Sequence, residues 1–180
     1  MNCAGLFEVT NMYEEKLMDY VIQLSRKTME WPGTQPFGAI VVRDSNIVGE
    51  GVNREMADND PTAHGEIQAI RDACRRLDTT DLSDCVLYAI GEPCPMCTVA
   101  IRLASVQKVY YGATHLDALN AYEGLDETPY ADIGVESLRV EASLPVEERS
   151  TPYTQHNRDA CAAVYWEWSK STQRQLGLFP

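Results

Sequence analysis

The sequence lacks any long apolar run and any segment that resembles a secretion signal. No stretch among its 180 residues approaches the roughly 18 to 20 apolar residues that a membrane-spanning helix needs. The first eight residues, MNCAGLFE, contain neither the basic region nor the apolar region of a signal peptide. We therefore expect a cytoplasmic protein that does not have a membrane as a partner.

Clustered basic residues are also missing. The chain has 15 lysines and arginines against 27 aspartates and glutamates, which gives a formal net charge of -12. Its basic residues occur at most as adjacent pairs, such as Arg26-Lys27 and Arg75-Arg76. Proteins that bind nucleic acids need a basic patch to neutralise phosphates. The composition therefore disfavours a nucleic-acid partner and favours a small, weakly charged substrate.

The cysteine spacing does not suggest a disulfide framework. Of the six cysteines, only Cys94 and Cys97 are spaced as a motif. In a protein without a secretion signal, such a pair is typical of a metal or redox site. Cys74 and Cys85 lie within apolar patterns, so we interpret them as small buried hydrophobic residues.

The length and the hydrophobic patterning predict one α/β domain over residues 1–180. Helical periodicity is found over 12–30, 62–78, 94–104 and 160–170. Strand patterns occupy 37–42, 47–53, 85–90, 106–111 and 137–144, and the first two form a hairpin. The polar segment 54–61 is expected to be a loop. Because strand, helix and strand alternate between 85 and 111, we expect a parallel crossover. The prediction is a three-layer α/β/α domain with a mixed five-stranded sheet.

Two short motifs combine the ligands of a zinc site. His64-Gly65-Glu66 offers an imidazole and a carboxylate, and the segment Pro93–Cys97 offers two thiols. His64, Cys94 and Cys97 would supply three ligands and leave the carboxylate of Glu66 over. Catalytic zinc sites use three protein ligands and keep one position for water, whereas structural sites use four. The motifs therefore predict a catalytic site that holds one Zn2+ per chain.

Both motifs are expected at helix N-termini. Pro95 suits a first helical turn, which places Cys94 near the N-cap and Cys97 one turn later on the same face. The helix dipole and the free amides there lower thiol pKa values. His64 and Glu66 are two positions apart, about 200° around a helix, so they cannot share a face. The metal is therefore expected off the end of the helix, with Glu66 beside a zinc-bound water.

Each motif alone has a simpler interpretation. A single histidine at a helix start is more often a cap or a core residue, and Cys-Pro-Met-Cys also suits a thioredoxin-like redox pair. A redox enzyme does not require the upstream His64 and Glu66, and a non-catalytic zinc module does not require Glu66. The combination of the two motifs favours a catalytic zinc centre.

Together the motifs match the zinc deaminase signature, His-x-Glu followed by Pro-Cys-x-x-Cys. The chain resembles the cytidine deaminase-like superfamily, and within it the bacterial guanine deaminase and nucleoside deaminase branch. The resemblance rests on segments 36–39, 49–53, 60–64 and 92–97, and it covers residues 12 to 126 well. It implies the cytidine deaminase-like fold.

The resemblance implies a hydrolase that acts on C–N bonds of cyclic amidines. The reaction would be the deamination of a free, guanine-like purine base or a related aminated heterocycle, with release of ammonia. Zinc would convert water to hydroxide at neutral pH for attack on the amino-bearing carbon. Glu66 would act as the proton shuttle. Asn53, Phe37 and Asp117 match positions that contact the base, although a turn-forming Asn, a core Phe and an exposed loop Asp are alternative interpretations.

Three departures from the family pattern affect the choice of substrate. Gly65 replaces the usual Ala, residues 98–103 lack an expected aromatic, and the C-terminal aromatics match only loosely. The resemblance implies that the C-terminal segment, about 145–180, packs on or exchanges with a partner subunit, and exposed C-terminal aromatics would favour a homodimer. The motifs thus indicate the reaction but do not identify the ring that is deaminated. The alternatives are a tRNA adenosine deaminase and a deaminase of a pyrimidine, pterin or triazine ring.

Overall fold

The computed structural model describes residues 12–122 and 134–170. The chain divides into two compact units, Met1–Val135 and Glu136–Pro180. The strands that the described residues form all belong to the first unit.

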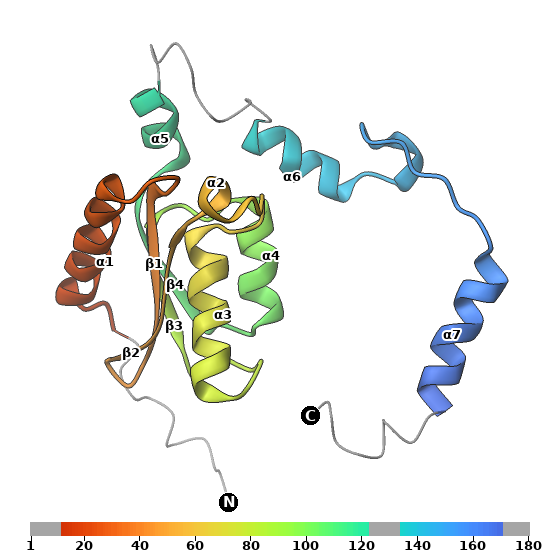
Figure 1. Ribbon diagram of the computed structural model, residues 1–180, viewed down its shortest axis with the longest axis horizontal. Coiled ribbons are helices and arrows are strands. Elements are labelled where there is room, and N and C mark those ends of the chain that lie inside the picture. Colours follow the sequence, from red (N-terminus) through yellow and green to blue (C-terminus); the bar gives the residue numbers. More distant parts are fainter. Residues whose placement is uncertain (1–11, 123–133, 171–180) are drawn as a thin grey trace, which may run out of the picture. The chain divides into compact units, whose positions relative to one another are not determined.

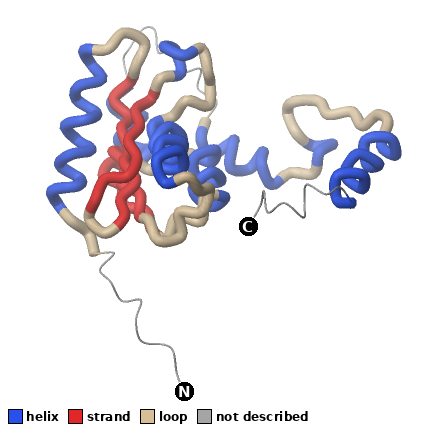
Figure 2. Tube along the Cα trace, turned by 60° about the horizontal axis from the view of Figure 1, so that its bottom comes forward, coloured by secondary structure: helices blue, strands red, loops and turns tan. Residues whose placement is uncertain are grey.

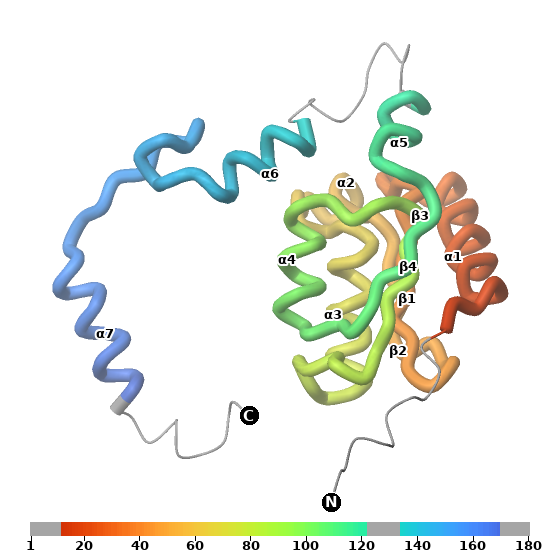
Figure 3. The backbone as a smooth tube through the Cα atoms, turned by 180° about the vertical axis from the view of Figure 1, so that it is seen from behind, coloured from red at the N-terminus to blue at the C-terminus, as the bar shows by residue number. Residues whose placement is uncertain are grey.

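A four-stranded mixed sheet is the middle layer of the first unit (Figure 1). The strand order is β2-β1-β3-β4, in which β1 is antiparallel to both β2 and β3, and β3 is parallel to β4. The expected hairpin and the expected parallel crossover are both confirmed, and Figure 3 follows the crossover from β3 through α4 to β4. The elements span Gln35–Arg43 (β1), Asn46–Asn53 (β2), Val86–Gly91 (β3), Lys108–Ala113 (β4) and Pro95–Leu103 (α4).

One face of the sheet is covered by helix α1 (Glu15–Lys27), which continues into the 3-10 turn η1 (Thr28–Glu30). Its buried residues Leu17, Met18 and Val21 recur at helical spacing. Ser25 ties the helix to the sheet, since its Oγ donates to the carbonyl of Val21 at 2.8 Å and accepts the N–H of Gly38 at 3.1 Å. The sheet residues of this core are Ile40, Val42, Val86 and Tyr88.

The opposite face carries α3 (Gly65–Leu77) and α4, so helices lie on both sides of the strands (Figure 2). The second core lies between these helices and the sheet, and small or aliphatic side chains fill it. The predicted three-layer α/β/α arrangement is therefore confirmed. This core contains Ala39, Val41, Ala69, Ile70, Ala73, Leu82, Cys85, Leu87, Ala89, Ile101 and Ala104.

Helix α3 lies very close to β2 because the residues between them are small. A Cβ built on Gly51 would overlap the carbonyl oxygen of Gly65 and the amide nitrogen of Ala69. Only glycine permits such an approach of one backbone to another. The contact fixes the position of the first turn of α3, which follows directly after His64.

The strand expected at 137–144 is wrong, and the sheet has four strands instead of five. Residues Val135–Ser143 form helix α6, in which Leu138 and Val140 are exposed. The alternation of apolar and polar residues suggested a strand, but the backbone of a strand needs a neighbouring strand for its hydrogen bonds. No strand among the described residues pairs with this segment, whereas a helix closes its own bonds. An i,i+3 ion pair between Glu136 and Arg139 adds support.

The remaining elements are short helices and the C-terminal helix. The segment 54–61, expected as a loop, contains the one-turn helix α2 (Glu55–Asp58). Helix α5 (His115–Tyr122) follows β4, and the second unit adds the 3-10 turn η2 (Val146–Glu148). The expected C-terminal helix is confirmed as α7 (Arg158–Lys170). None of the helices in the described ranges is both long and apolar enough to cross a bilayer.

Two cysteines outside the motif serve the core, as expected. Cys85 is fully buried, and burial raises the pKa of its thiol to about 12. Cys74 is partly buried against the same core, and burial also raises the pKa of its thiol. Both remain protonated at neutral pH and are therefore poor nucleophiles and poor metal ligands.

We expect Gly51→Ala to lower the free energy of unfolding by about 1 to 3 kcal/mol, because the added methyl group must push α3 away from β2. Urea titration measures this change. Gly91→Ala is the matched control, since a Cβ there would lie 3.8 Å from its nearest neighbour, the carbonyl oxygen of Ala113. Equal stabilities of the two variants would contradict the close approach of helix and strand.

Candidate metal centre and active site

The candidate residues gather at one edge of the sheet. Because β1 runs antiparallel to both of its neighbours, strands β2, β3 and β4 all end at this edge. Asn53 ends β2, the loop before Cys94 follows β3, and α5 follows β4. Loops after strand ends are the common place for ligands in α/β proteins. The topology therefore joins segments that lie far apart in the sequence.

His64 and Cys94 are the N-cap residues of α3 and α4. Both have extended backbones, with φ -68° and ψ 154° for His64 and φ -67° and ψ 169° for Cys94. Neither side chain makes a capping hydrogen bond to its own helix, so both can turn towards a shared ligand. Pro95 lies in the first turn of α4, as expected, and Cys97 follows one turn after the cap.

The three predicted ligands form one cluster. Their ligand atoms all lie within 4.8 Å of one another. Nδ1 of His64 is 3.5 Å from Sγ of Cys94 and 3.5 Å from Sγ of Cys97. Tetrahedral zinc, with Zn–S bonds of roughly 2.3 Å and Zn–N bonds of roughly 2.05 Å, would separate sulfur and nitrogen by about 3.5 Å. Both the donor set and its spacing fit zinc.

The two thiols differ in their affinity for protons. The pKa of Cys94 is lowered to about 4. The main cause is a hydrogen bond that the thiol of Cys97 donates to the sulfur of Cys94, and a hydrogen bond from His64 to the same sulfur adds to it. Donation to that thiolate, together with burial, raises the pKa of Cys97, and the same thiolate raises the pKa of His64. The cluster therefore offers one thiolate in advance. Zinc would displace the remaining proton, because thiolates are the metal-binding form.

Glu66 lies beside the cluster and is not a member of it. It is the second residue of α3, it is only 9% exposed, and its carboxyl group interacts with the thiol of Cys97. Burial raises the pKa of this carboxyl group. A buried carboxyl group at such a position can both accept and donate a proton during a reaction. The arrangement can thus move a proton next to a bound metal.

Asn53 is buried, at 2% exposure, where β2 ends. Its Nδ2 donates to Oε2 of Glu55 at 2.6 Å, and its Oδ1 accepts the backbone N–H of Glu55 at 3.1 Å. The second bond is the turn-forming contact that the alternative interpretation expected. The other carboxylate oxygen of Glu55, Oε1, lies 3.6 Å from Nε2 of His64. Sequence reasoning missed Glu55, because a polar residue in an expected loop has no pattern that predicts such contacts.

Phe37 and Gly65 meet through their backbones. A Cβ on Gly65 would overlap the carbonyl oxygen of Phe37, so this glycine lets β1 approach the start of α3. Phe37 is half-buried and lies at an irregularity in the pairing of β1 with β2, between Gln35 and Gly38. The structure thus places Phe37 next to the motif that holds His64, and it gives a packing reason for the unusual glycine.

Asp117 lies in the first turn of α5 and not in a loop. Oδ2 of Asp117 accepts two hydrogen bonds from Thr114, one from the backbone N–H at 2.8 Å and one from the hydroxyl group at 2.5 Å. In return, Oγ1 of Thr114 accepts the backbone N–H of Asp117 at 3.2 Å. This is a capping box, and these bonds lower the pKa of Asp117. Glu92, which directly follows β3, accepts the N–H of His115 at 3.3 Å. It therefore anchors the start of α5 beside the cysteine loop.

Gln35 is a second residue that sequence reasoning missed. It pairs with Asn53 across β1 and β2, and directly opposed residues in a sheet share one face. Its Oε1 is buried and has no hydrogen-bond partner among the residues that the structure describes. A buried carbonyl oxygen without a donor is costly, so this atom is a candidate acceptor for a ligand.

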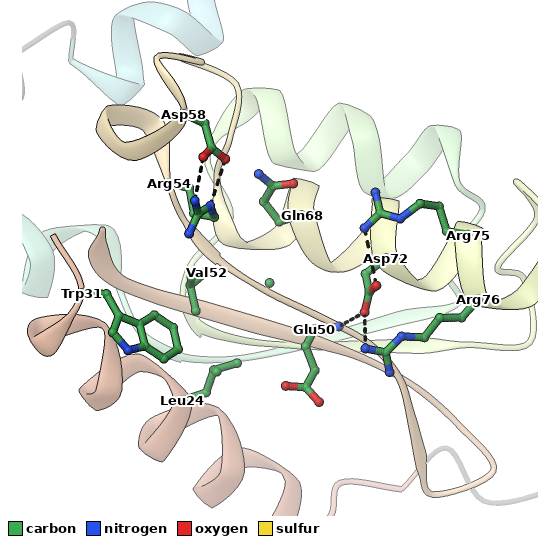
Figure 4. A pocket seen from close by; sticks show the side chains of 11 residues that line it. Leu24, Trp31, Glu50, Val52, Arg54, Asp58, Gln68, Asp72, Arg75 and Arg76 are labelled. Carbon is green, nitrogen blue, oxygen red and sulfur yellow. Dashed lines mark hydrogen bonds and ion pairs between the residues drawn. The ribbon is translucent and has the colours of Figure 1, made fainter. Parts of the chain in front are cut away.

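A separate hollow lies where β2 meets α1 and α3 (Figure 4). The cluster of His64, Cys94 and Cys97 does not line it. Its basic side chains are paired with acids: Arg54 with Asp58, and Arg75 and Arg76 with Asp72. Such paired charges have little attraction left for phosphate, which agrees with the acidic composition.

Comparison with known proteins identifies the family of the site. The family model described as the cytidine and deoxycytidylate deaminase zinc-binding region matches residues 12–113. A guanine deaminase of Bacillus subtilis is 44% identical over 120 residues, which cover 67% of this chain and 70% of that protein. A tRNA-specific adenosine deaminase of Aquifex aeolicus is 36% identical over 119 residues, which cover 64% of this chain and 78% of that protein.

Solved structures give the same result. A crystal structure of guanine deaminase from Bacillus subtilis superposes with a TM-score of 0.77 and 36% identity, covering 89% of this chain and 96% of that chain. A structure solved in complex with 2,6-diaminopurine has a TM-score of 0.55 and 31% identity, covering 84% of this chain and 79% of that chain. The similarity therefore extends over the fold and the metal-binding segments.

We expect Cys94→Ser and Cys97→Ser to abolish the binding of zinc, because each removes one of three protein ligands. Metal analysis of the purified protein should find one zinc per chain in the unchanged protein and almost none in either variant. Cys161→Ser is the control, since Cys161 is exposed on α7 and should leave the zinc content unchanged. A full zinc content in either motif variant would refute the assigned cluster.

Proposed function

This chain belongs to the cytidine and deoxycytidylate deaminase family, and we propose that it deaminates a free purine base of the guanine type. The family and the relatives make it a zinc-dependent hydrolase that acts on C–N bonds. The choice of base is our proposal. The observation that carries it is a three-ligand metal cluster with Glu66 beside it and the buried Asn53 at the same sheet edge.

The chemistry divides between the metal and the protein. When bound to His64, Cys94 and Cys97, zinc supplies the Lewis acidity that makes a water molecule nucleophilic at neutral pH. Glu66 accepts a proton from that water and delivers it to a ring nitrogen of the base. A C–O bond forms at the amino-bearing carbon and the C–N bond to the amino group breaks. Glu66 then takes the second proton, from the hydroxyl group added to the carbon, and passes it to the leaving amine, which departs as ammonia.

The base would be held by side chains from three segments. Asn53 keeps one N–H and one lone pair beyond its bonds to Glu55, which suits an edge of a purine that both accepts and donates. Both bonds from Thr114 converge on Oδ2 of Asp117, so Oδ1 is left for an N–H group of the base. Gln35 adds a buried acceptor. Phe37 would contact the face of the ring.

A tRNA substrate is the second candidate, because a tRNA-specific deaminase is among the relatives. The net charge of -12 disfavours a polyanion, and the arginines of the hollow on β2 are already paired. A free base carries no phosphate and needs no such patch. These observations support the base over the tRNA.

Ammonia release across a panel of aminated heterocycles tests the substrate. The panel contains guanine, 2,6-diaminopurine, adenine, a pterin, a triazine, cytosine and a tRNA anticodon stem-loop. We expect the highest kcat/KM for guanine and no turnover of the stem-loop. A higher kcat/KM for the stem-loop, or for a ring other than a purine, would overturn the proposed substrate.

Glu66→Gln tests the role of Glu66 in the mechanism. The amide cannot carry the proton, so the variant should lose turnover by about 100- to 10,000-fold on the best substrate of the panel. Its zinc content should stay at one per chain, because Glu66 lies outside the cluster. An unchanged rate would exclude Glu66 as the proton shuttle.

We also infer that the protein is a homodimer in which the segment 145–180 packs on or exchanges with the partner subunit. Support comes from α7, where Tyr165 is 74% and Trp166 67% exposed. Large apolar side chains in such a group favour association. Sedimentation equilibrium should give twice the chain mass of 20.1 kDa. The double variant Tyr165→Ser, Trp166→Ser should shift the protein to monomer, and a monomeric unchanged protein would refute the inference.

A further inference from the structure

We propose that Glu55 is a positioning residue that couples the metal site to the recognition of the base. One carboxylate oxygen orients the amide of Asn53 and the other selects the tautomer of His64. The part of this inference that concerns the base rests on the proposed function, whereas the part that concerns zinc does not.

The first contact settles which way round the amide of Asn53 lies. An amide can present its oxygen and nitrogen in two orientations that differ by a flip. Glu55 admits only one of them, because its backbone N–H must meet an acceptor and its Oε2 must meet a donor. Nδ2 therefore donates at 2.6 Å and Oδ1 accepts at 3.1 Å. The donor and acceptor that Asn53 offers to a base are fixed before the base binds, which saves the cost of ordering them.

The second contact decides which ring nitrogen of His64 is available to a metal. Nδ1 lies 3.5 Å from both sulfurs, and Nε2 lies 3.6 Å from Oε1 of Glu55. A separation of 3.6 Å is longer than a well-formed hydrogen bond, so the contribution is electrostatic. Negative charge beside Nε2 favours the proton there, so the proton that zinc would displace from His64 is the one on Nδ1. Carboxylates in this position are known to orient metal-binding histidines and to raise their basicity.

The backbone around Glu55 is held in place on both sides. The N–H of Arg54 donates to the carbonyl of Ala63, the residue before His64, at 2.8 Å. The N–H of Ala57 donates to the carbonyl of Gly33 at 3.0 Å. The carboxylate is only 22% exposed, which strengthens its interactions relative to those of a fully solvated group. Glu55 thus acts from a rigid position and not from a mobile loop.

The two oxygens of Glu55 face one nitrogen each, and a carboxylate suits both contacts. Nδ2 of Asn53 lies 2.6 Å from Oε2, and Nε2 of His64 lies 3.6 Å from Oε1. Glutamine in place of Glu55 has one oxygen and one NH2 group, so it must turn a donor towards one of the two partners. Aspartate keeps both acceptors on a shorter side chain. The two variants therefore separate the need for two acceptors from the need for reach.

The first test measures zinc release to a chromogenic chelator from the zinc-loaded full-length protein. We expect Glu55→Gln to release zinc about 10- to 100-fold faster than the unchanged protein, because a supporting partner of a ligand has been lost. Glu55→Asp should lie between the two. Asp58→Asn is the matched control, since Asp58 is on the same one-turn helix, pairs with Arg54 at the surface, and should leave the rate unchanged.

A spectroscopic readout separates positioning from a general loss of structure. Nitrogen-15 NMR of labelled histidine should show His64 bound to zinc through Nδ1 and protonated at Nε2. In Glu55→Gln the Nε2–H signal should shift or broaden by exchange, while thermal unfolding of the variant stays cooperative. Unchanged release of zinc together with an unchanged imidazole spectrum would overturn the metal arm of the proposal.

A double-mutant cycle tests the arm that concerns the base, on the best substrate of the panel. Asn53→Ala and Glu55→Gln should each raise KM, and the double variant should lose less than the product of the two single effects, because both disrupt one contact. Independent, multiplicative effects would refute the coupling through Asn53. If no heterocycle is turned over, the proposed function fails, and the zinc-release test still decides the role of Glu55 at His64.

Discussion

The close contact between α3 and β2 determines where the metal site forms. The backbone of the helix packs against Gly51, so the first residues of α3 are held relative to the strand end. His64 then meets the sulfurs of Cys94 and Cys97, which come from the start of α4, the helix next to α3 on the same face of the sheet. Metal–ligand distances tolerate errors of only about 0.2 Å. The packing of the second core therefore also determines the geometry of the metal site.

The sheet edge concentrates negative charge in a protein that is already acidic. Cys94 as a thiolate, Glu66 and Glu55 all lie at or beside the cluster. The N-termini of α3 and α4 offset part of this charge through their dipoles. A divalent cation would offset the rest and make the second thiolate accessible. Zinc binding would thus stabilise the folded protein as well as enable the reaction.

In the function that we propose, reaction and specificity depend on different parts of this edge. The metal cluster and Glu66 come from two helix starts, where backbone geometry leaves little freedom. Asn53 and Gln35 come from paired strands, and Asp117 from the capping box of α5. Under the proposed function, substitutions in the second group would change the ring that is bound without disturbing the metal. Glu55 touches both groups, and for this reason we propose that it links affinity for zinc to orientation of the base.

Local spacing in the sequence was enough to determine the chemistry. Cys94 and Cys97 are one turn apart at a proline-marked helix start, so their position on α4 followed from local rules. Apolar periodicity likewise identified α1, α3, α7 and the four strands. The strand predicted at 137–144 was wrong, because an alternating sequence forms a strand only where a neighbouring strand can pair with it. Without such a partner among the described residues, the segment forms an exposed helix. Tertiary structure alone decided the contacts of Glu55, the buried oxygen of Gln35 and the contact of Gly65 with Phe37. These contacts depend on how segments that are distant in the sequence approach each other, and local sequence patterns do not predict such distances.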